Sequence, residues 1–235
     1  MAEELFREDS YLRSCEATVT GMTAGGVTLD RTVFYPMGGG QPGDCGVLRL
    51  GEGVEVRIAD TVKDKETGDI LHVLAEGETP PPAGSRVTAE IDWDRRHRLM
   101  RMHSCLHLLC SLVPGAVTGG SVGDGKGRLD FDLEESPDKD DLTARLNALV
   151  AADTPVAHSW ITDEELAANP EMVRTMSVKP PTGSGRVRVI AVEGVDLQPC
   201  GGTHVARTGE IGPVQVTKIE KKGRLNRRIS VAFAP

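Results

Sequence analysis

Residues 94–113 read DRRHRLMRMHSCLHLLCSLV, and this stretch decides how the rest of the chain is interpreted. Its apolar residues recur at the spacing of one helix face: Leu99, Met102, Leu106, Leu109 and Val113. Asp92 or Asp94 suits the N-cap position, and Pro114-Gly115 ends the pattern. The stretch therefore predicts a helix from about Asp94 to Val113.

Upstream of this helix, the chain reads as short strands separated by Gly, Pro or Asp turns. Alternating or β-branched apolar residues occupy Cys15–Thr20, Val27–Phe34, Val54–Asp60, Ile70–Leu74 and Arg86–Ile91. Several short strands at this spacing are typical of a small β-barrel. We expect residues 1–92 to form this barrel domain, with a boundary at Asp92–Trp93.

Downstream of the helix, further helices and strands are mixed. One helix is expected from Asp138 to Ala151, and another opens at Thr162, where Thr162 and Glu165 form a capping box. Strands are expected at Val187–Val192, Ile211–Ile219 and Arg228–Phe233, the last two as a hairpin. This mixture predicts an α+β domain with an antiparallel sheet over residues 93–235.

Composition places the chain among soluble globular proteins. Of its 235 residues, 39% are hydrophobic and 26% are charged, which is ordinary for that class. The N-terminus has no apolar segment of the secretory type, and no apolar run is long enough to span a bilayer. Five cysteines without disulfide spacing fit a reducing compartment. We expect a cytoplasmic protein that makes no membrane contact.

Charge limits the kind of nucleic-acid binding that is expected. The net charge of -8 argues against broad, non-specific attraction to a phosphate backbone. Basic residues nevertheless cluster at residues 95–101 and 218–228. Local clusters on an acidic body permit a shaped RNA site, although each cluster taken alone is better explained as a solvated face.

Four residues in two distant segments have the chemistry of a zinc site. His103 and His107 lie four apart, which puts both rings on one face of the expected helix. Cys200-Gly-Gly-Thr-His204 adds a thiolate and an imidazole, and its glycines free the backbone to curl. Imidazole and thiolate ligands favour zinc over magnesium or calcium. We expect one zinc ion per chain on His103, His107, Cys200 and His204.

Other interpretations of these residues stay open. The histidines are also explained as core or surface residues, and Cys200 as a buried thiol. Cys110 lies on the same helix face and is an alternative ligand, although a small core residue explains it better; Cys105 is expected to be structural. Ser104 follows His103 where a thermolysin-like protease has glutamate, so that class of protease is disfavoured.

These motifs resemble the editing domain of alanyl-tRNA synthetase. The resemblance is carried by His103-Ser-Cys-Leu-His107, by Cys200-Gly-Gly-Thr-His204 and the residues that follow to Gly212, by Phe34-Tyr-Pro-Met-Gly-Gly-Gly-Gln-Pro-Gly-Asp44 and by Asn226-Arg-Arg-Ile229. It extends from about Cys15 to Val231. The second domain is thereby similar to the synthetase's second additional domain.

The resemblance implies an activity and a partner. The chain has no room for an aminoacylation domain and looks like the freestanding editing proteins of the AlaX type. This implies hydrolysis of mischarged Ser-tRNA(Ala), and of Gly-tRNA(Ala) as a further substrate, without ATP. The synthetase usually has Thr at the position of Leu106 and often Gln at that of Thr118; freestanding members are more similar to this chain at both.

The resemblance also assigns roles to residues. Thr118 matches the position that reads the serine hydroxyl, and Gly39, Gly40 and Gln41 lie in the segment that approaches the active site or the tRNA end. A turn threonine explains Thr118 equally well. A glycine-rich hairpin turn also explains Gly39, Gly40 and Gln41, but the resemblance favours the functional role. Candidate tRNA contacts are Arg98, Arg101, Lys222, Arg227 and Arg228.

Two other functions remain compatible with the sequence. One is a non-catalytic, zinc-stabilised tRNA-binding module, and the other is a zinc hydrolase of a small ester. Zinc either activates water or orients and polarises the substrate, and the second role is preferred because four protein ligands close the shell. The oligomeric state has no signal in the sequence.

Overall fold

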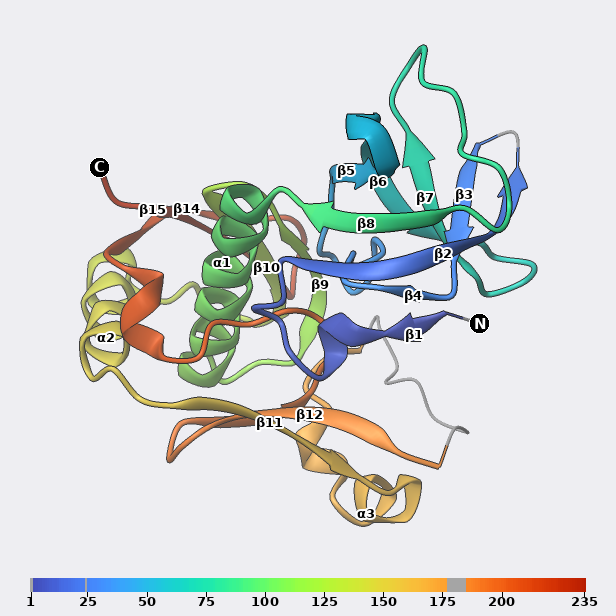
Figure 1. Ribbon diagram of the computed structural model, residues 1–235. Helices are drawn as coiled ribbons and strands as arrows, with labels where there is room; N and C mark the ends of the chain where they lie inside the picture. The colour runs from blue at the N-terminus through green and yellow to red at the C-terminus, as the bar shows by residue number, and fades with distance from the viewer. Residues whose placement is uncertain (1, 24, 177–184) are drawn as a thin grey trace. The chain divides into compact units, whose positions relative to one another are not determined.

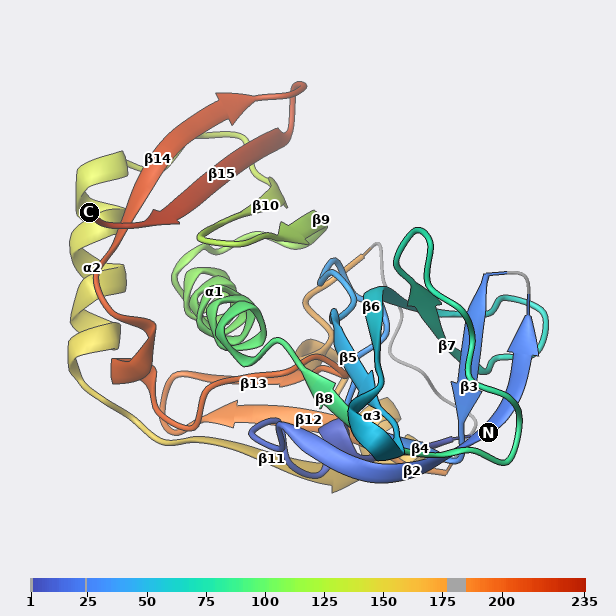
Figure 2. The same cartoon turned by 45° about the horizontal axis from the view of Figure 1, so that its top comes forward.

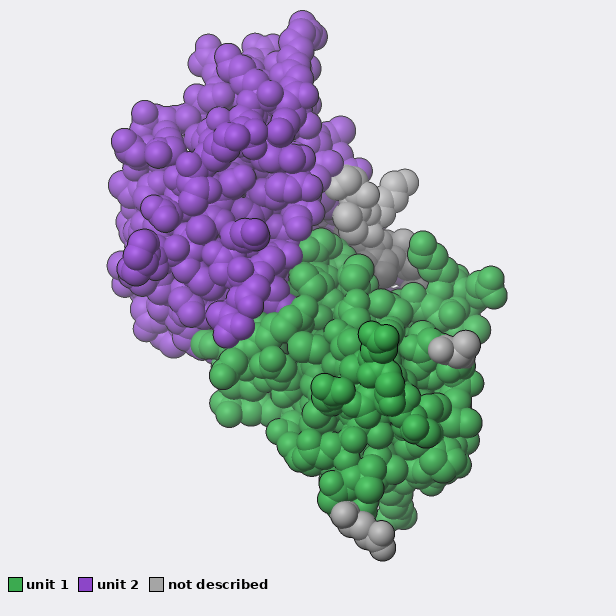
Figure 3. Space-filling view, turned by 90° about the horizontal axis from the view of Figure 1, so that it is seen from above, with its two compact units in different colours: residues 1–97 green, residues 98–235 purple. Residues whose placement is uncertain are grey.

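The computed structural model describes residues 2–23, 25–176 and 185–235. The chain forms two compact units, Met1–His97 and Arg98–Pro235 (Figure 3). The division falls within helix α1 (Trp93–Leu112), whose first residues belong to the first unit. The domain boundary expected at Asp92–Trp93 stays a prediction, because the two compact units do not show whether each part of the chain folds independently.

The first unit is a closed barrel of six antiparallel strands, in the order β2-β3-β7-β6-β5-β8 (Figure 1). The strands are β2 (Ser14–Thr23), β3 (Gly26–Leu29), β5 (Gly46–Arg49), β6 (Glu55–Lys63), β7 (Ile70–Leu74) and β8 (Arg86–Ile91). Short strands β1 (Glu3–Glu4) and β4 (Arg31–Thr32) pair in parallel, and short 3-10 helices span Leu5–Arg7 and Gly51–Gly53. The β-barrel predicted from strand spacing is confirmed.

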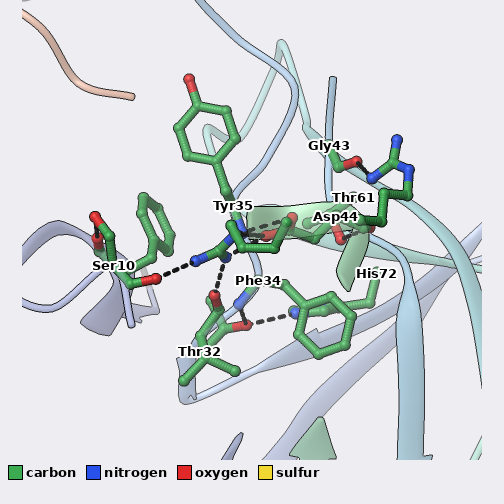
Figure 4. A network of polar contacts seen from close by, with 12 residues as sticks. Ser10, Thr32, Phe34, Tyr35, Gly43, Asp44, Thr61 and His72 are labelled. Atoms are coloured by element: carbon green, nitrogen blue, oxygen red, sulfur yellow. Dashed lines mark hydrogen bonds and ion pairs between the residues drawn. The ribbon is translucent and has the colours of Figure 1, made fainter. Parts of the chain in front are cut away.

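A buried ion pair joins the first turn of α1 to this barrel (Figure 4). The Arg96 side chain is 0% exposed and donates from Nε to both carboxylate oxygens of Asp44, at 3.0 and 2.9 Å. Its other nitrogens donate to the carbonyls of Ser10 and Val33. The sequence placed Arg96 in a basic surface cluster; the structure corrects this, because Asp44 supplies the counter-charge that permits its burial.

The second unit places α1 between two antiparallel sheets (Figure 2). One sheet has the order β14-β15-β10-β9 and comprises β9 (Val117–Val122), β10 (Lys126–Asp132), β14 (Val214–Lys221) and β15 (Asn226–Phe233). The other comprises β11 (Val156–Ile161), β12 (Val187–Val192) and β13 (Asp196–Pro199). The remaining helices are α2 (Lys139–Ala151), α3 (Asp163–Ala168) and 3-10 helices at Pro170–Met172 and Thr208–Ile211.

Helix α1 is buried on all sides along its middle. Every residue from Met102 to Cys110 is buried, which explains why His103 and His107 lie inside the unit. On one side, β10 approaches so closely that a Cβ at Gly127 would meet Met102 and Leu106 at about 3 Å. A helix buried in this way needs partners on opposite faces, and the two sheets supply them.

Several local predictions for this unit are confirmed. Asp138 caps α2 by accepting hydrogen bonds from the amides of Asp140 and Asp141, and Thr162 with Glu165 forms the capping box of α3. Strands β14 and β15 pair as the expected hairpin. The sequence did not predict β9, β10, β11 and β13 of this unit, nor β1 and β5 of the first unit. Strand β9 contains Gly119 and Gly120, which weaken a local strand signal, and β10 pairs with both β9 and β15.

Mixed helices and strands with antiparallel sheets therefore agree with the expected α+β class. Within the described residues, no helix has the length and apolar character needed to cross a membrane.

Candidate metal centre

The four predicted ligands meet at one point in the second unit. His103 and His107 come from α1, whereas Cys200 and His204 come from the loop that follows β13. One donor atom from each residue lies within 4.8 Å of all the others. The Cys200 Sγ atom is 3.3 Å from Nε2 of His204 and 3.6 Å from Nε2 of His103.

The two separations from Cys200 Sγ suit a tetrahedral ion, whereas the 4.8 Å limit of the whole group is wider than such an ion would leave. Zinc–nitrogen and zinc–sulfur bonds of about 2.0–2.3 Å at tetrahedral angles place neighbouring donor atoms about 3.3–3.6 Å apart. Three imidazoles and one thiolate are also a soft to borderline donor set, which favours zinc over the hard cations. The residues present therefore fit a zinc ion in chemistry, and the Cys200 separations fit it in spacing.

The loop that carries Cys200 and His204 is shaped from within the unit. The amide of Gly202 donates to Cys200 Sγ at 3.4 Å, as expected when the chain curls around a thiolate. Arg188 of β12 is buried and donates from Nη1 to the carbonyls of Cys200 and Gly202, at 3.0 and 2.9 Å. This guanidinium fixes the loop that brings the second ligand pair to α1.

Side chains behind two of the histidines were not predicted. Nδ1 of His107 lies 3.2 Å from Oδ2 of Asp196, and Nδ1 of His204 lies 3.1 Å from Oγ of Ser104. Asp196 is in turn held by Gln198. A signal was present, because Asp196, Gln198 and Cys200 alternate along an extended segment and so share one face.

The charges of the site depend on its burial and on these neighbours. Burial would raise the pKa of the Cys200 thiol, but the imidazoles of His103 and His204 hold that pKa well below its ordinary value. Burial would lower the pKa of His107, but Asp196 and Cys200 outweigh it and raise that pKa to about 10. The Cys200 thiol is thus ready to act as a thiolate ligand.

The other cysteines of α1 stay outside the cluster. Cys110 is buried and donates its thiol to Oε1 of Gln198, at a sulfur–oxygen distance of 3.8 Å. Burial raises the pKa of Cys110 to about 11 and that of Cys105 to about 12. Neither thiol belongs to the four-ligand group, in line with the preferred interpretation of both as core residues.

Thr118 occupies an irregular position of the four-stranded sheet. Val117 pairs with Phe131 and Gly119 pairs with Asp130, so Thr118 is an extra residue of β9 that has no partner on β10. Its hydroxyl donates to the carbonyl of Asp130 at 3.2 Å. Such a bulge redirects one side chain out of the sheet's alternation.

The glycine-rich segment forms a tight turn in the first unit. Gly38 and Gln41 exchange two backbone hydrogen bonds across Gly39 and Gly40, whose φ angles are +56° and +81°. Both angles are positive, a region that glycine adopts at no steric cost, which explains the two glycines. Gln41 is buried. The substrate role of these residues stays a prediction.

The five candidate tRNA contacts all bind within the chain. Arg98 pairs with Asp124, Arg101 donates to the carbonyl of Ile211, and Lys222 pairs with Glu220. Arg228 pairs with Asp130 through both carboxylate oxygens. Arg227 is 3% exposed and donates to the carbonyls of its own turn and to that of Glu134. Their contact with tRNA stays a prediction.

Comparisons with known proteins match both units. The family described as threonyl and alanyl tRNA synthetase second additional domain matches residues 187–230, and class II (A) tRNA synthetases match residues 8–95. Alanyl-tRNA editing protein AlaX-M of Methanosarcina barkeri is 38% identical, with 97% of this chain and 98% of that protein covered. AlaX-M of Saccharolobus solfataricus is 32% identical over the full length of both. Alanine–tRNA ligase of Pyrobaculum neutrophilum is 36% identical, but only 25% of it is covered.

Proposed function

This chain belongs to the family of alanyl-tRNA editing proteins, and we propose that it hydrolyses the ester of mischarged Ser-tRNA(Ala) with the help of one zinc ion. The observation that carries the proposal is the cluster of His103, His107, Cys200 and His204, with all donor atoms within 4.8 Å. The full-length similarity to AlaX-M proteins supports the substrate class, and Gly-tRNA(Ala) is a second expected substrate. No ATP is required, because ester hydrolysis is favourable by itself.

The proposed reaction needs a polarised carbonyl and a placed water. His103, His107, Cys200 and His204 would hold the zinc ion, whose positive charge would polarise the ester and orient the aminoacyl group. The chain contributes a ligand loop that accepts hydrogen bonds from Arg188 and a helix whose middle is buried. Both features keep the donor atoms in place between substrates.

Selection of serine requires a group that needs the serine hydroxyl. Alanine differs from serine only by lacking that hydroxyl, so a pocket rejects alanine by leaving a polar group unpaired. Thr118 is our candidate, since the bulge turns it away from the regular sheet and its own O–H proton is already donated to Asp130. The Thr118 oxygen can then accept the proton of the serine hydroxyl.

We assign the remaining predicted residues to the tRNA. Gly39 and Gly40 would offer backbone amides to the substrate end, and Gln41 would hold their turn through its hydrogen bonds with Gly38. The basic residues at the tip of the β14–β15 hairpin would meet phosphate, with exposed Lys221 and Arg224 joining Lys222. The cytoplasm, where charged tRNA is used, is the expected location.

The decisive experiment compares Ser-tRNA(Ala), Gly-tRNA(Ala) and Ala-tRNA(Ala) as substrates for the native protein and for Cys200→Ala, with the zinc content of both measured. We expect native protein with one zinc to deacylate Ser-tRNA(Ala) fastest, to deacylate Gly-tRNA(Ala) more slowly because glycine also lacks the hydroxyl that Thr118 would read, and to spare Ala-tRNA(Ala). We expect Cys200→Ala to lose zinc and activity together. A native protein that binds tRNA and zinc without deacylation would instead be a zinc-stabilised binding module. Turnover of small esters without tRNA would support the third function.

A further inference from the structure

We propose that Asp196 is a positioning residue of the metal centre, which holds His107 so that its Nε2 lone pair faces the metal. Ser104 does the same for His204 as a neutral partner. This inference rests on the metal assignment of the proposed function, and it adds to that assignment the residues that orient the ligands.

Asp196 is built into a rigid position. Its side chain is 2% exposed, and Oδ2 lies 3.2 Å from Nδ1 of His107. Gln198 donates from Nε2 to both carboxylate oxygens, at 2.8 and 2.9 Å, and accepts from the Cys110 thiol. The carboxylate therefore cannot rotate away, and it selects the His107 tautomer that carries its proton on Nδ1.

Ser104 plays the matching part between the two halves of the site. It lies on α1 between the two ligands of that helix, and its Oγ is 3.1 Å from Nδ1 of His204. The amide of Val205 donates to the same oxygen at 3.2 Å. An oxygen that accepts from both Nδ1 and Val205 leaves Nε2 of His204 facing Cys200, 3.3 Å from its sulfur.

Asp196 carries a negative charge and Ser104 is neutral, and this difference suits the net charge of the metal centre. A dication with one thiolate and three neutral imidazoles leaves one net positive charge in a buried place. Burial of a charge is costly unless an opposite charge is near. The Asp196 carboxylate offsets the remaining charge through His107, whereas a second carboxylate behind His204 would make the centre negative.

The test compares zinc affinity in Asp196→Asn with that in the native protein, by chelator competition at constant pH. Asparagine keeps the shape of the side chain and removes its charge. We expect zinc to bind about 10- to 100-fold more weakly, as for other partners of metal-bound histidines. Ser104→Ala is expected to act in the same direction. Asp130→Asn is the matched control, because Asp130 is a buried carboxylate of the same unit that pairs with Arg228.

A spectroscopic readout separates positioning from general stability. With cobalt(II) in place of zinc, the visible ligand-field bands of Asp196→Asn should shift from those of the native protein, while the thiolate charge-transfer band stays. Should Asp196→Asn fail to fold, histidine ¹⁵N shifts of native zinc-loaded protein replace it, and they should show Nδ1 protonated on His107 and His204.

The outcomes distinguish this inference from the function on which it rests. Native protein that binds no zinc would remove the metal assignment itself. Native protein that binds zinc, with Asp196→Asn within about twofold of it, would overturn only the positioning role. An equal loss of affinity in Asp130→Asn, unshifted cobalt bands, or metal on Nδ1 of His107 would overturn it as well.

Discussion

Replacement of Thr118 by valine tests how the protein recognises serine. Valine keeps the β-branched shape but removes the hydroxyl, which donates to the carbonyl of Asp130 and is free to accept from the substrate. Glycine has no side-chain hydroxyl for Thr118 to read. The substitution should therefore reduce hydrolysis of Ser-tRNA(Ala) and leave hydrolysis of Gly-tRNA(Ala) nearly unchanged.

The expected size follows from the exposure of Thr118. A neutral hydrogen bond contributes about 0.5–1.5 kcal/mol, which corresponds to about 2- to 13-fold in kcat/KM. A fully buried serine hydroxyl without a partner would cost up to about 3 kcal/mol. Thr118 is only half-buried, so water can replace part of the lost bond. We expect a decrease of about tenfold for Ser-tRNA(Ala).

The assay measures kcat/KM for both substrates with Thr118→Val and with Thr118→Ser, which retains a hydroxyl. Thr118→Ser should keep the ratio of the two substrates close to that of the native protein. An equal decrease of kcat/KM for both substrates with Thr118→Val would leave their ratio unchanged. This outcome would refute the assignment and mean that Thr118 supports the bulge rather than reads the hydroxyl.

Three further predictions concern the metal, the barrel and tRNA. Zinc affinity should rise by about tenfold per pH unit between pH 7 and pH 9, because binding must displace the proton of His107. Burial lowers the pKa of His107, but its neighbours raise that pKa to about 10. Chelator competition across this pH range measures the change in zinc affinity. Arg96→Met should lower the free energy of unfolding by about 3–5 kcal/mol in urea denaturation, since it leaves the Asp44 carboxylate buried without its guanidinium. Lys221→Glu with Arg224→Glu should weaken tRNA binding and reduce its salt dependence, because both exposed cations are expected to meet phosphate.

Each of these predictions has a control or a contrary outcome. Zinc affinity that is constant with pH would contradict the displaced proton. Arg95→Met should cost about 1 kcal/mol, because the Arg95 guanidinium donates to the carbonyl of Gly43; an equal cost for Arg96→Met would contradict the buried pair. Arg145→Glu on α2 should leave tRNA binding unchanged. An equal loss of tRNA affinity in Arg145→Glu would mean that net charge, rather than the position of the hairpin residues, controls binding.

The candidate residues that the sequence identified are those that lie a few positions apart along the chain. The separation of four residues between His103 and His107 indicates that both rings share one helix face. The glycines between Cys200 and His204 indicate a curled segment. The Thr162 capping box and the β14–β15 hairpin are local in the same sense. In each case the atoms that interact lie within a few residues along the chain, so local geometry suffices to predict them.

Features that depend on residues far apart in the chain could not be predicted from the sequence. Arg96 is indistinguishable in sequence from its basic neighbours, and only Asp44, 52 residues away, makes its burial possible. Strand β9 contains Gly119 and Gly120, and β10 contains Gly127, which leaves room for Met102 and Leu106 of α1; β10 also pairs with β15, far along the chain. Asp196 and Ser104 become partners of His107 and His204 only once α1 lies against the loop that follows β13.

The amino-acid sequence by itself predicted the cluster of three histidines and one cysteine, the main helix and the family to which the chain is similar, because residue type and short-range periodicity carry that information. The tertiary structure alone decided which charges are buried, which histidine nitrogen faces the cluster and where Thr118 leaves the regular sheet. The physical reason is that burial, ion pairing and strand register are set by groups far apart in the chain, whose energies exist only after the chain has brought them together.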